Sequence, residues 1–127
     1  MSKIAAIGDS FGGSLTVLLA EREPDLRAAV ISCAGYSWGR SPQLQPRLLK
    51  AVGEVRLPLF FIPAANDYSV APGKTMDARL KQLHNPHRLK IYPPIGHTAD
   101  EGHCFLYHGV SSWEPDVFAF LNQCMRR

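Results

Sequence analysis

The chain has 127 residues and a formal net charge of +3 at pH 7. Hydrophobic residues make up 46% and charged residues 20% of it, a balance typical of a globular domain with a buried core, which excludes disordered and collagen-like chains. The length predicts a single domain over residues 1–127. No apolar stretch approaches the roughly 20 residues of a membrane-spanning helix. Because the basic residues are scattered, no nucleic-acid-binding surface is predicted.

The cysteines and the first residues of the chain indicate the cellular compartment. Cys33, Cys104 and Cys124 are odd in number and far apart, which favours reduced thiols over a disulfide framework. Residues 1–3 lead directly into an apolar segment, without the charged n-region, long h-region and cleavage site of a secretory signal. We therefore expect a cytoplasmic protein.

Short apolar runs alternate with helix-like segments along the chain. Strands are expected at 3–7, 28–33, 57–63 and 88–92, and helices at 11–21, 46–52, 73–83 and 114–125. The connections are long enough for right-handed crossovers between parallel strands. The alternation therefore predicts an α/β fold in which helices flank a parallel sheet of about four strands.

Prolines and the final apolar residues refine this outline. Pro46 is expected to be the first residue of its helix, and Pro115 to lie in the first turn of the last helix, where a missing N–H costs little. The segment between the last strand and the last helix is expected to be a long loop. Three apolar residues of the last helix are assigned to the core: Phe118, Phe120 and Leu121.

The turn between the first expected strand and helix carries the clearest chemical signal. Its sequence, Gly8-Asp9-Ser10-Phe11-Gly12, contains the pattern G-x-S-x-G in the strand–turn–helix setting of a nucleophile elbow. The two glycines would let strand and helix approach closely, and the turn would raise the serine hydroxyl above the sheet. We therefore predict Ser10 as nucleophile and the Phe11 N–H as one donor of the oxyanion hole. A serine that only caps the helix is the alternative.

An acid and a base follow in the order Ser, Asp, His that this elbow uses. Asp67 lies just past the strand expected at 57–63, at the carboxyl end of the sheet, where open α/β folds place their sites. An ordinary Asn-Asp turn is the alternative there. His97 and His103 both follow a glycine in the segment after the last strand. Chemistry alone leaves the choice between these two bases open.

Taken together, these segments resemble the C-terminal half of α/β-hydrolase-fold enzymes of the dienelactone hydrolase family. The resemblance extends through GDSFGGSLTVLLAERE, AAVISCAGYSW, FFIPAANDYSVAPGK and LKIYPPIGHTADEGHCF. It implies Ser10 as nucleophile, Asp67 as orienting acid and His103 as base, with His97 as the second choice. It also implies a small-molecule ester or lactone substrate and no cofactor. Because that family typically uses cysteine as its nucleophile, the serine indicates a broader esterase-like or peptidase-like relative.

Complete members of such a fold have about four further strands before the nucleophile strand, with the loop that supplies a second oxyanion N–H. Without them, the strand expected at 3–7 would lie at the edge of the sheet with unpaired backbone groups. We therefore expect a fragment, either a truncated reading frame or one part of a protein that another chain completes. The exposed edge predicts self-association.

Two other functions compete with this interpretation. Esterases of the GDSL (SGNH) type would use the same Ser10 and His103 but take Asp100 as the acid. A catalytically inactive fragment or interaction module is the second alternative.

Several side chains near these motifs are weaker candidates. Tyr36 and Trp38, in the loop after the second strand, are candidates to line a substrate pocket, with packing over the helices as the alternative. His97, Asp100 and His103, with His108, could be drawn as metal ligands. Because a single loop rarely gives ligands the convergent geometry that a metal needs, we predict no metal site.

Overall fold

The computed structural model describes residues 3–126 and contains a four-stranded parallel sheet in the order β1-β2-β3-β4. The strands are β1 (Ile4–Asp9), β2 (Leu26–Ser32), β3 (Leu59–Phe61) and β4 (His87–Leu89). A bridge between Ala64 and Tyr92 continues the pairing of β3 and β4 beyond their carboxyl ends. The predicted α/β class with a parallel sheet is therefore confirmed.

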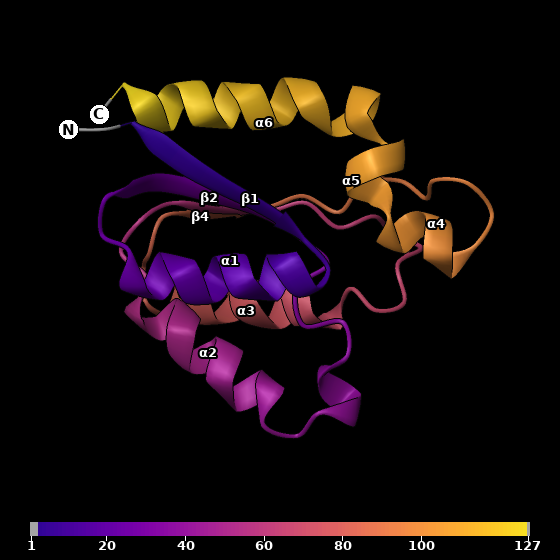
Figure 1. Cartoon of the computed structure of the whole chain (residues 1–127), viewed down its shortest axis with the longest axis horizontal. Helices are drawn as coiled ribbons and strands as arrows, with labels where there is room; N and C mark the ends of the chain where they lie inside the picture. The colour runs from indigo at the N-terminus through magenta and orange to yellow at the C-terminus, as the bar shows by residue number, and fades with distance from the viewer. Residues whose placement is uncertain (1–2, 127) are drawn as a thin grey trace.

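Helices cover both faces of this sheet (Figure 1). They are α1 (Phe11–Arg22), the 3-10 helix η1 (Trp38–Arg40), α2 (Leu44–Glu54), α3 (Ala71–Gln82), α4 (Ala99–His103), α5 (Phe105–His108) and α6 (Val110–Met125). Figure 1 shows α1, α2 and α3 on one face and α6 on the other, with α4 and α5 beyond one end of the sheet. This arrangement creates two apolar layers.

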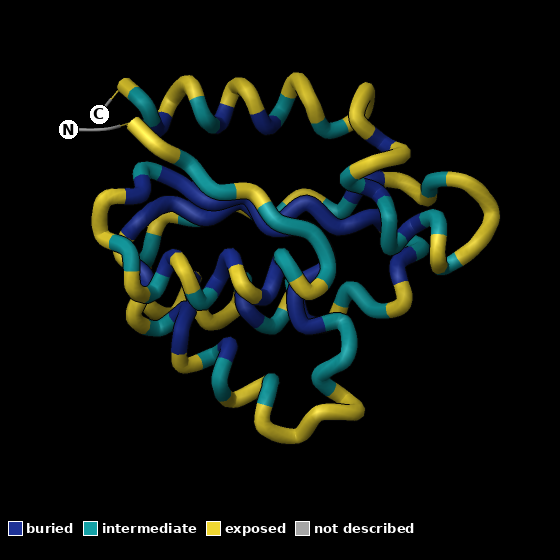
Figure 2. The backbone as a smooth tube through the Cα atoms, in the orientation of Figure 1, coloured by how far each residue is buried: buried dark blue, intermediate teal, exposed yellow. Residues whose placement is uncertain are grey.

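Strand β2 shows why its residues form the centre of the fold. Ala29 and Ile31 belong to the apolar layer against α1, α2 and α3, whereas Ala28 and Val30 belong to the layer against α6. Successive side chains of a strand point to opposite faces, so a strand covered on both sides needs an unbroken apolar run. Figure 2 shows β2 buried along most of its length.

Helix α6 differs from the expected last helix in two respects. It begins at Val110, four residues before the expected start at 114, and Pro115 lies inside it. The Trp113 indole N–H donates to the carbonyl of Leu106 at 3.1 Å, which anchors the additional turn. The assignment of Phe118 to the core is wrong, because its side chain is 53% exposed.

The buried side of α6 explains that correction. Val117, Phe120 and Cys124 are buried at i, i+3 and i+7, which defines one face of a helix. Phe118 follows Val117 by about 100° around the helix axis and therefore lies outside that face.

Strand β1 occupies the edge of the sheet, as expected. Its Ile4 and Ile7 side chains are 52% and 49% exposed, in contrast to the buried strand β2 beside it. Within residues 3–126, none of the helices combines the length and apolar character needed to cross a membrane.

Candidate active site

The turn between β1 and α1 consists of a single residue, Ser10. Its backbone has φ 60° and ψ −120°, a region that non-glycine residues seldom adopt. The Ser10 N–H donates to the carbonyl of Ser32 at 2.9 Å, which ties the turn to the end of β2. Phe11 begins α1, so its N–H has no acceptor within the helix. The strained turn has the geometry of a nucleophile elbow.

The two glycines of this motif have different roles. A Cβ at Gly8 would collide with the carbonyl of Gly12 and the hydroxyl of Thr16, so only glycine lets β1 approach α1 this closely. A Cβ at Gly12 would meet nothing within 4 Å. The expectation that both glycines permit the approach is therefore correct for Gly8 and wrong for Gly12.

Three of the predicted side chains meet at the carboxyl end of the sheet. Ser10 Oγ lies 2.7 Å from His103 Nε2, and His103 Nδ1 lies 2.8 Å from Asp67 Oδ1. If Nδ1 carries the proton that Asp67 accepts, Nε2 is free to accept the serine proton. The Asp67 side chain is 0% exposed and that of His103 is 12% exposed. The chain thus brings the predicted nucleophile, base and acid into hydrogen-bond contact.

Asp67 is held in place by the turn that follows β3. Its N–H donates to the carbonyl of Ala64 at 3.1 Å, and the N–H of Tyr68 donates to its Oδ1 at 2.6 Å. Its other oxygen, Oδ2, is buried and has no hydrogen-bond partner among the described residues. Oδ1 therefore makes hydrogen bonds with both the Tyr68 N–H and the His103 imidazole.

The base reaches the serine on a short helix, α4, where a long loop was expected. Thr98 caps α4 by accepting the N–H of Glu101 at 3.1 Å, and the Glu101 carboxylate accepts the N–H of His97 at 3.1 Å. The His97 N–H, and to a smaller extent the Thr98 hydroxyl, which donates to the same carboxylate at 3.2 Å, lower the pKa of Glu101. Residues 98–101 match the capping-box pattern T-x-x-E, a signal that could have predicted this helix.

Asn66 secures the same segment, a role that sequence reasoning missed. Its Nδ2 donates to the carbonyls of Ile95 and Thr98 at 2.8 and 2.9 Å, and its Oδ1 accepts the N–H of Ile95 at 3.0 Å. A Cβ at Gly102 would lie 2.6 Å from atoms of Asn66, so glycine is needed for α4 to pack here. That contact sets the position of the next residue, His103.

The alternative acid and base lie outside this relay. His97 is exposed, and the imidazole that contacts both Ser10 and Asp67 is that of His103. Asp100 is also exposed, and the carboxylate bonded to His103 is that of Asp67. The catalytic roles of all these residues stay predictions.

Two tyrosines line the space beside the imidazole. The ring centroids of Tyr36 and Tyr68 lie 4.3 and 5.2 Å from that of His103. A hollow of about 510 Å³ is lined by Tyr36, Tyr68 and Arg40. Trp38, the other pocket candidate, follows the alternative and packs against the core layer under α1, α2 and α3. Tyr68 was missed, although it directly follows the predicted acid.

Burial governs the other titratable groups nearby. It raises the pKa of Asp9, while a hydrogen bond to Ser32 and the nearby His103 partly offset the effect. It also raises the pKa of the Cys33 thiol far above its usual range. Among the described residues, potential metal-ligand atoms converge at Cys33, Asp67 and His103, within 4.8 Å of one another. A metal there would need the thiolate that burial opposes.

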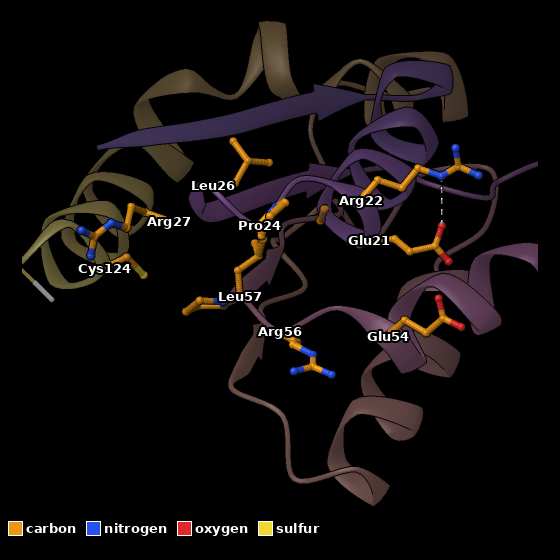
Figure 3. Close-up of a pocket in the computed structure, with 11 residues that line it drawn as sticks. Glu21, Arg22, Pro24, Leu26, Arg27, Glu54, Arg56, Leu57 and Cys124 are labelled. Atoms are coloured by element: carbon orange, nitrogen blue, oxygen red, sulfur yellow. Dashed lines mark ion pairs between the residues drawn. The ribbon is translucent and has the colours of Figure 1, made fainter. Parts of the chain in front are cut away.

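The larger pocket of about 640 Å³ lies at the opposite, amino end of the strands (Figure 3). Its apolar floor includes Leu26 and Leu57, and arginine and glutamate side chains surround it. No serine or histidine belongs to its described lining. The candidate active site is therefore the smaller hollow beside His103, where parallel sheets bind their ligands.

Comparison with known proteins identifies the fold and the family. An esterase of Pyrococcus furiosus superposes with a TM-score of 0.73 at 16% identity, covering 97% of this chain and 54% of the esterase. A putative dienelactone hydrolase from Klebsiella pneumoniae gives 0.68 at 23% identity, covering 94% and 51%. An acylaminoacyl peptidase of Pyrococcus horikoshii gives 0.73 at 14% identity, covering 98% and 24%. The chain thus spans about half the length of the first two structures.

A search of curated proteins found no match. The family model described as "Dienelactone hydrolase family" matches residues 1–109, which include the elbow, the acid and the base described above. The chain therefore belongs to the dienelactone hydrolase family.

Proposed function

We propose that this chain is the catalytic part of a serine hydrolase that cleaves carboxylic esters or lactones. The observation that carries the proposal is the continuous hydrogen-bond relay from Ser10 through His103 to Asp67, with contacts of 2.7 and 2.8 Å. Membership of the dienelactone hydrolase family supports ester or lactone chemistry.

The mechanism follows from the position of each proton. His103 Nε2 takes the hydroxyl proton as Ser10 Oγ attacks the carbonyl carbon, and Asp67 stabilises the resulting imidazolium. The imidazolium then gives its proton to the leaving alkoxide as the ester bond breaks. Water, activated by the same imidazole, attacks the acyl-enzyme and releases the acid, which restores the serine hydroxyl.

The negative charge that develops on the carbonyl oxygen needs donors. The Phe11 N–H at the start of α1 is the proposed first donor, aided by the positive end of the helix dipole. The hollow lined by Tyr36, Tyr68 and Arg40 is the proposed seat of the substrate. Its two aromatic rings suit a small apolar or aromatic ester group.

Hydrolysis of p-nitrophenyl acetate tests the proposal. The purified chain is expected to release nitrophenolate faster than its Ser10→Ala variant, and an organophosphonate probe is expected to modify Ser10 alone, as read by peptide mass spectrometry. Phe118→Ser, which changes an exposed side chain on α6, is the control for handling and purity. Equal rates for wild type and Ser10→Ala, together with no labelling of Ser10, would contradict the proposal.

A further inference from the structure

Cys33, the residue that follows β2, has an unusual backbone conformation. Its φ is +61°, in the left-handed region that favours glycine, although it carries a side chain. It is only 6% exposed. Such a conformation persists only where the surroundings impose it, and such residues gather at functional sites. The end of β2 therefore carries a buried residue whose backbone is strained.

The thiol of Cys33 lies beneath the acid and the base. Its Sγ is 3.2 Å from the carbonyl oxygen of His103, to which it donates, and 3.4 Å from the hydroxyl of Ser32. Its Sγ, an Asp67 carboxylate oxygen and a His103 ring nitrogen lie within 4.8 Å of one another. One side chain thus faces two members of the relay, Asp67 from the turn after β3 and His103 from α4.

The ionisation of this thiol limits what it can do. Burial raises the pKa of Cys33 far above neutrality, the Ser32 hydroxyl offsets this in part, and the neighbouring Asp67 and Asp9 carboxylates raise it further, so the thiol keeps its proton. A protonated thiol is neither a nucleophile nor a metal ligand, but it is a hydrogen-bond donor. The nearby Asp67 carboxylate has one buried oxygen, Oδ2, that lacks a partner within the described part of the chain.

We propose that Cys33 is a positioning residue whose thiol proton is shared between the His103 carbonyl and the Asp67 carboxylate, fixing the base and the acid relative to each other. The inference rests on the proposed hydrolase function. The neighbouring Ser32 carbonyl accepts the Ser10 N–H at 2.9 Å, so the end of β2 hydrogen-bonds to Ser10 and His103 and lies close to Asp67. The strained backbone at Cys33 directs the thiol toward this junction.

Four variants separate the donor from the backbone. Cys33→Ala removes the thiol but keeps the Cβ, Cys33→Ser restores a donor, and Cys33→Gly removes the thiol while relieving the positive φ. Cys104→Ala is the matched control, because this thiol directly follows His103 in the chain and makes no side-chain hydrogen bond that the structure records. Each is measured by kcat and KM for p-nitrophenyl acetate, and by thermal unfolding to establish that it folds.

A second readout does not depend on turnover. The His103 Nδ1 proton that bonds to Asp67 is expected to give a strongly downfield proton NMR resonance. We expect Cys33→Ala and Cys33→Gly to shift or broaden it, and Cys33→Ser and Cys104→Ala to retain it. If wild type lacks esterase activity, this resonance still tests the positioning role, so failure of the proposed function and failure of this inference are distinguishable.

The kinetic expectation is a fall of about tenfold in kcat for Cys33→Ala and Cys33→Gly with KM within about twofold of wild type, since one hydrogen bond to the relay is lost. Cys33→Ser is expected to recover most of that loss. A wild-type resonance in Cys33→Ala would overturn the inference. So would a Cys33→Ser variant that is no better than Cys33→Ala in both kcat and the resonance, because restoring a hydrogen-bond donor would then not restore the relay.

Discussion

Asp67 and Asp100 both offer a carboxylate near His103, and their surroundings distinguish them. The Asp67 side chain is 0% exposed and bonds Nδ1 of the imidazole at 2.8 Å, whereas Asp100 is an exposed residue of α4. A buried carboxylate both orients the imidazole and stabilises its charged form, because water does not compete for it.

The first prediction follows from this contrast. We expect Asp67→Asn to lower kcat about 10³- to 10⁴-fold, because the amide favours the wrong tautomer of His103, and Asp100→Asn to change it less than about twofold. Steady-state hydrolysis of p-nitrophenyl acetate measures both. The reverse result, with activity lost only in Asp100→Asn, would favour an acid–base pair of the GDSL type.

Asp9 leads to a prediction about stability and pH. Burial raises its pKa above the ordinary value of 3.8, so the folded chain holds this proton more tightly than the unfolded chain does. Stability is therefore expected to fall as pH rises from about 3.8 through the raised value, and to stay lower at neutral pH.

Replacement by the neutral amide removes this effect. Asp9→Asn is expected to melt at a higher temperature than wild type at pH 7, with the difference vanishing near pH 3, below both pKa values. Thermal unfolding of the two proteins across this pH range measures the difference. Parallel melting curves at every pH would show that burial of Asp9 has no such cost.

At the scale of elements, the contact between β1 and α1 sets the elbow. Alanine at Gly8 would place a methyl group against the carbonyl of Gly12 and the hydroxyl of Thr16, and Thr16 is itself fixed by a 2.7 Å hydrogen bond to that carbonyl. We expect Gly8→Ala to destabilise the chain by about 1–3 kcal/mol, the usual cost of overpacking.

Gly12→Ala is the matched control within the same motif. Its Cβ would meet nothing within 4 Å, and alanine favours a helix over glycine, so we expect unchanged or slightly higher stability. Urea unfolding of both variants compares them. An equal loss in the two would mean that the close approach is not what requires glycine at position 8.

The elements also show where sequence patterns were sufficient. Periodicity predicted α1 and α3 within two residues at each end, because the spacing of apolar residues along a helix is a local feature. It missed α4, whose five residues are too few for an apolar repeat and which depends on the Thr98 cap and on Asn66 from another loop. Short helices held by such contacts have weak patterns of their own.

For the molecule as a whole, the most unusual feature is exposed apolar surface around β1. The edge strand exposes Ile4 and Ile7, and the outer side of α1 exposes Phe11, Leu15 and Leu19 at a spacing of four residues. An edge strand with unpaired backbone groups and apolar side chains favours pairing with another chain. Within residues 3–126, β2 is the one strand paired with β1, which leaves its outer side unpaired by any strand (Figure 1).

We therefore expect the chain to self-associate in a concentration-dependent way. The double variant Ile4→Lys, Ile7→Lys should weaken association, because lysine on an edge strand opposes strand pairing. Tyr107→Lys is the control, since Tyr107 is 70% exposed on α5, away from β1. Sedimentation velocity measures the change, and a monodisperse monomer of the wild-type chain at high concentration would contradict the expectation.

Sequence by itself determined the local features of this protein. The elbow at Ser10 and the alternation of strands and helices follow from short-range patterns, which depend on backbone sterics and side-chain periodicity. The chain order of serine, aspartate and histidine can also be read directly from the sequence. Local residue patterns alone left His97 and Asp100 open as alternatives, and the family resemblance implied His103 and Asp67. The tertiary structure shows that these two residues lie together, with Tyr68 in place of Trp38 beside them. Those contacts join residues that lie 36 and 93 positions apart in the chain. Packing of separate segments at one edge of the sheet brings them within hydrogen-bond distance, and no local sequence pattern encodes that packing.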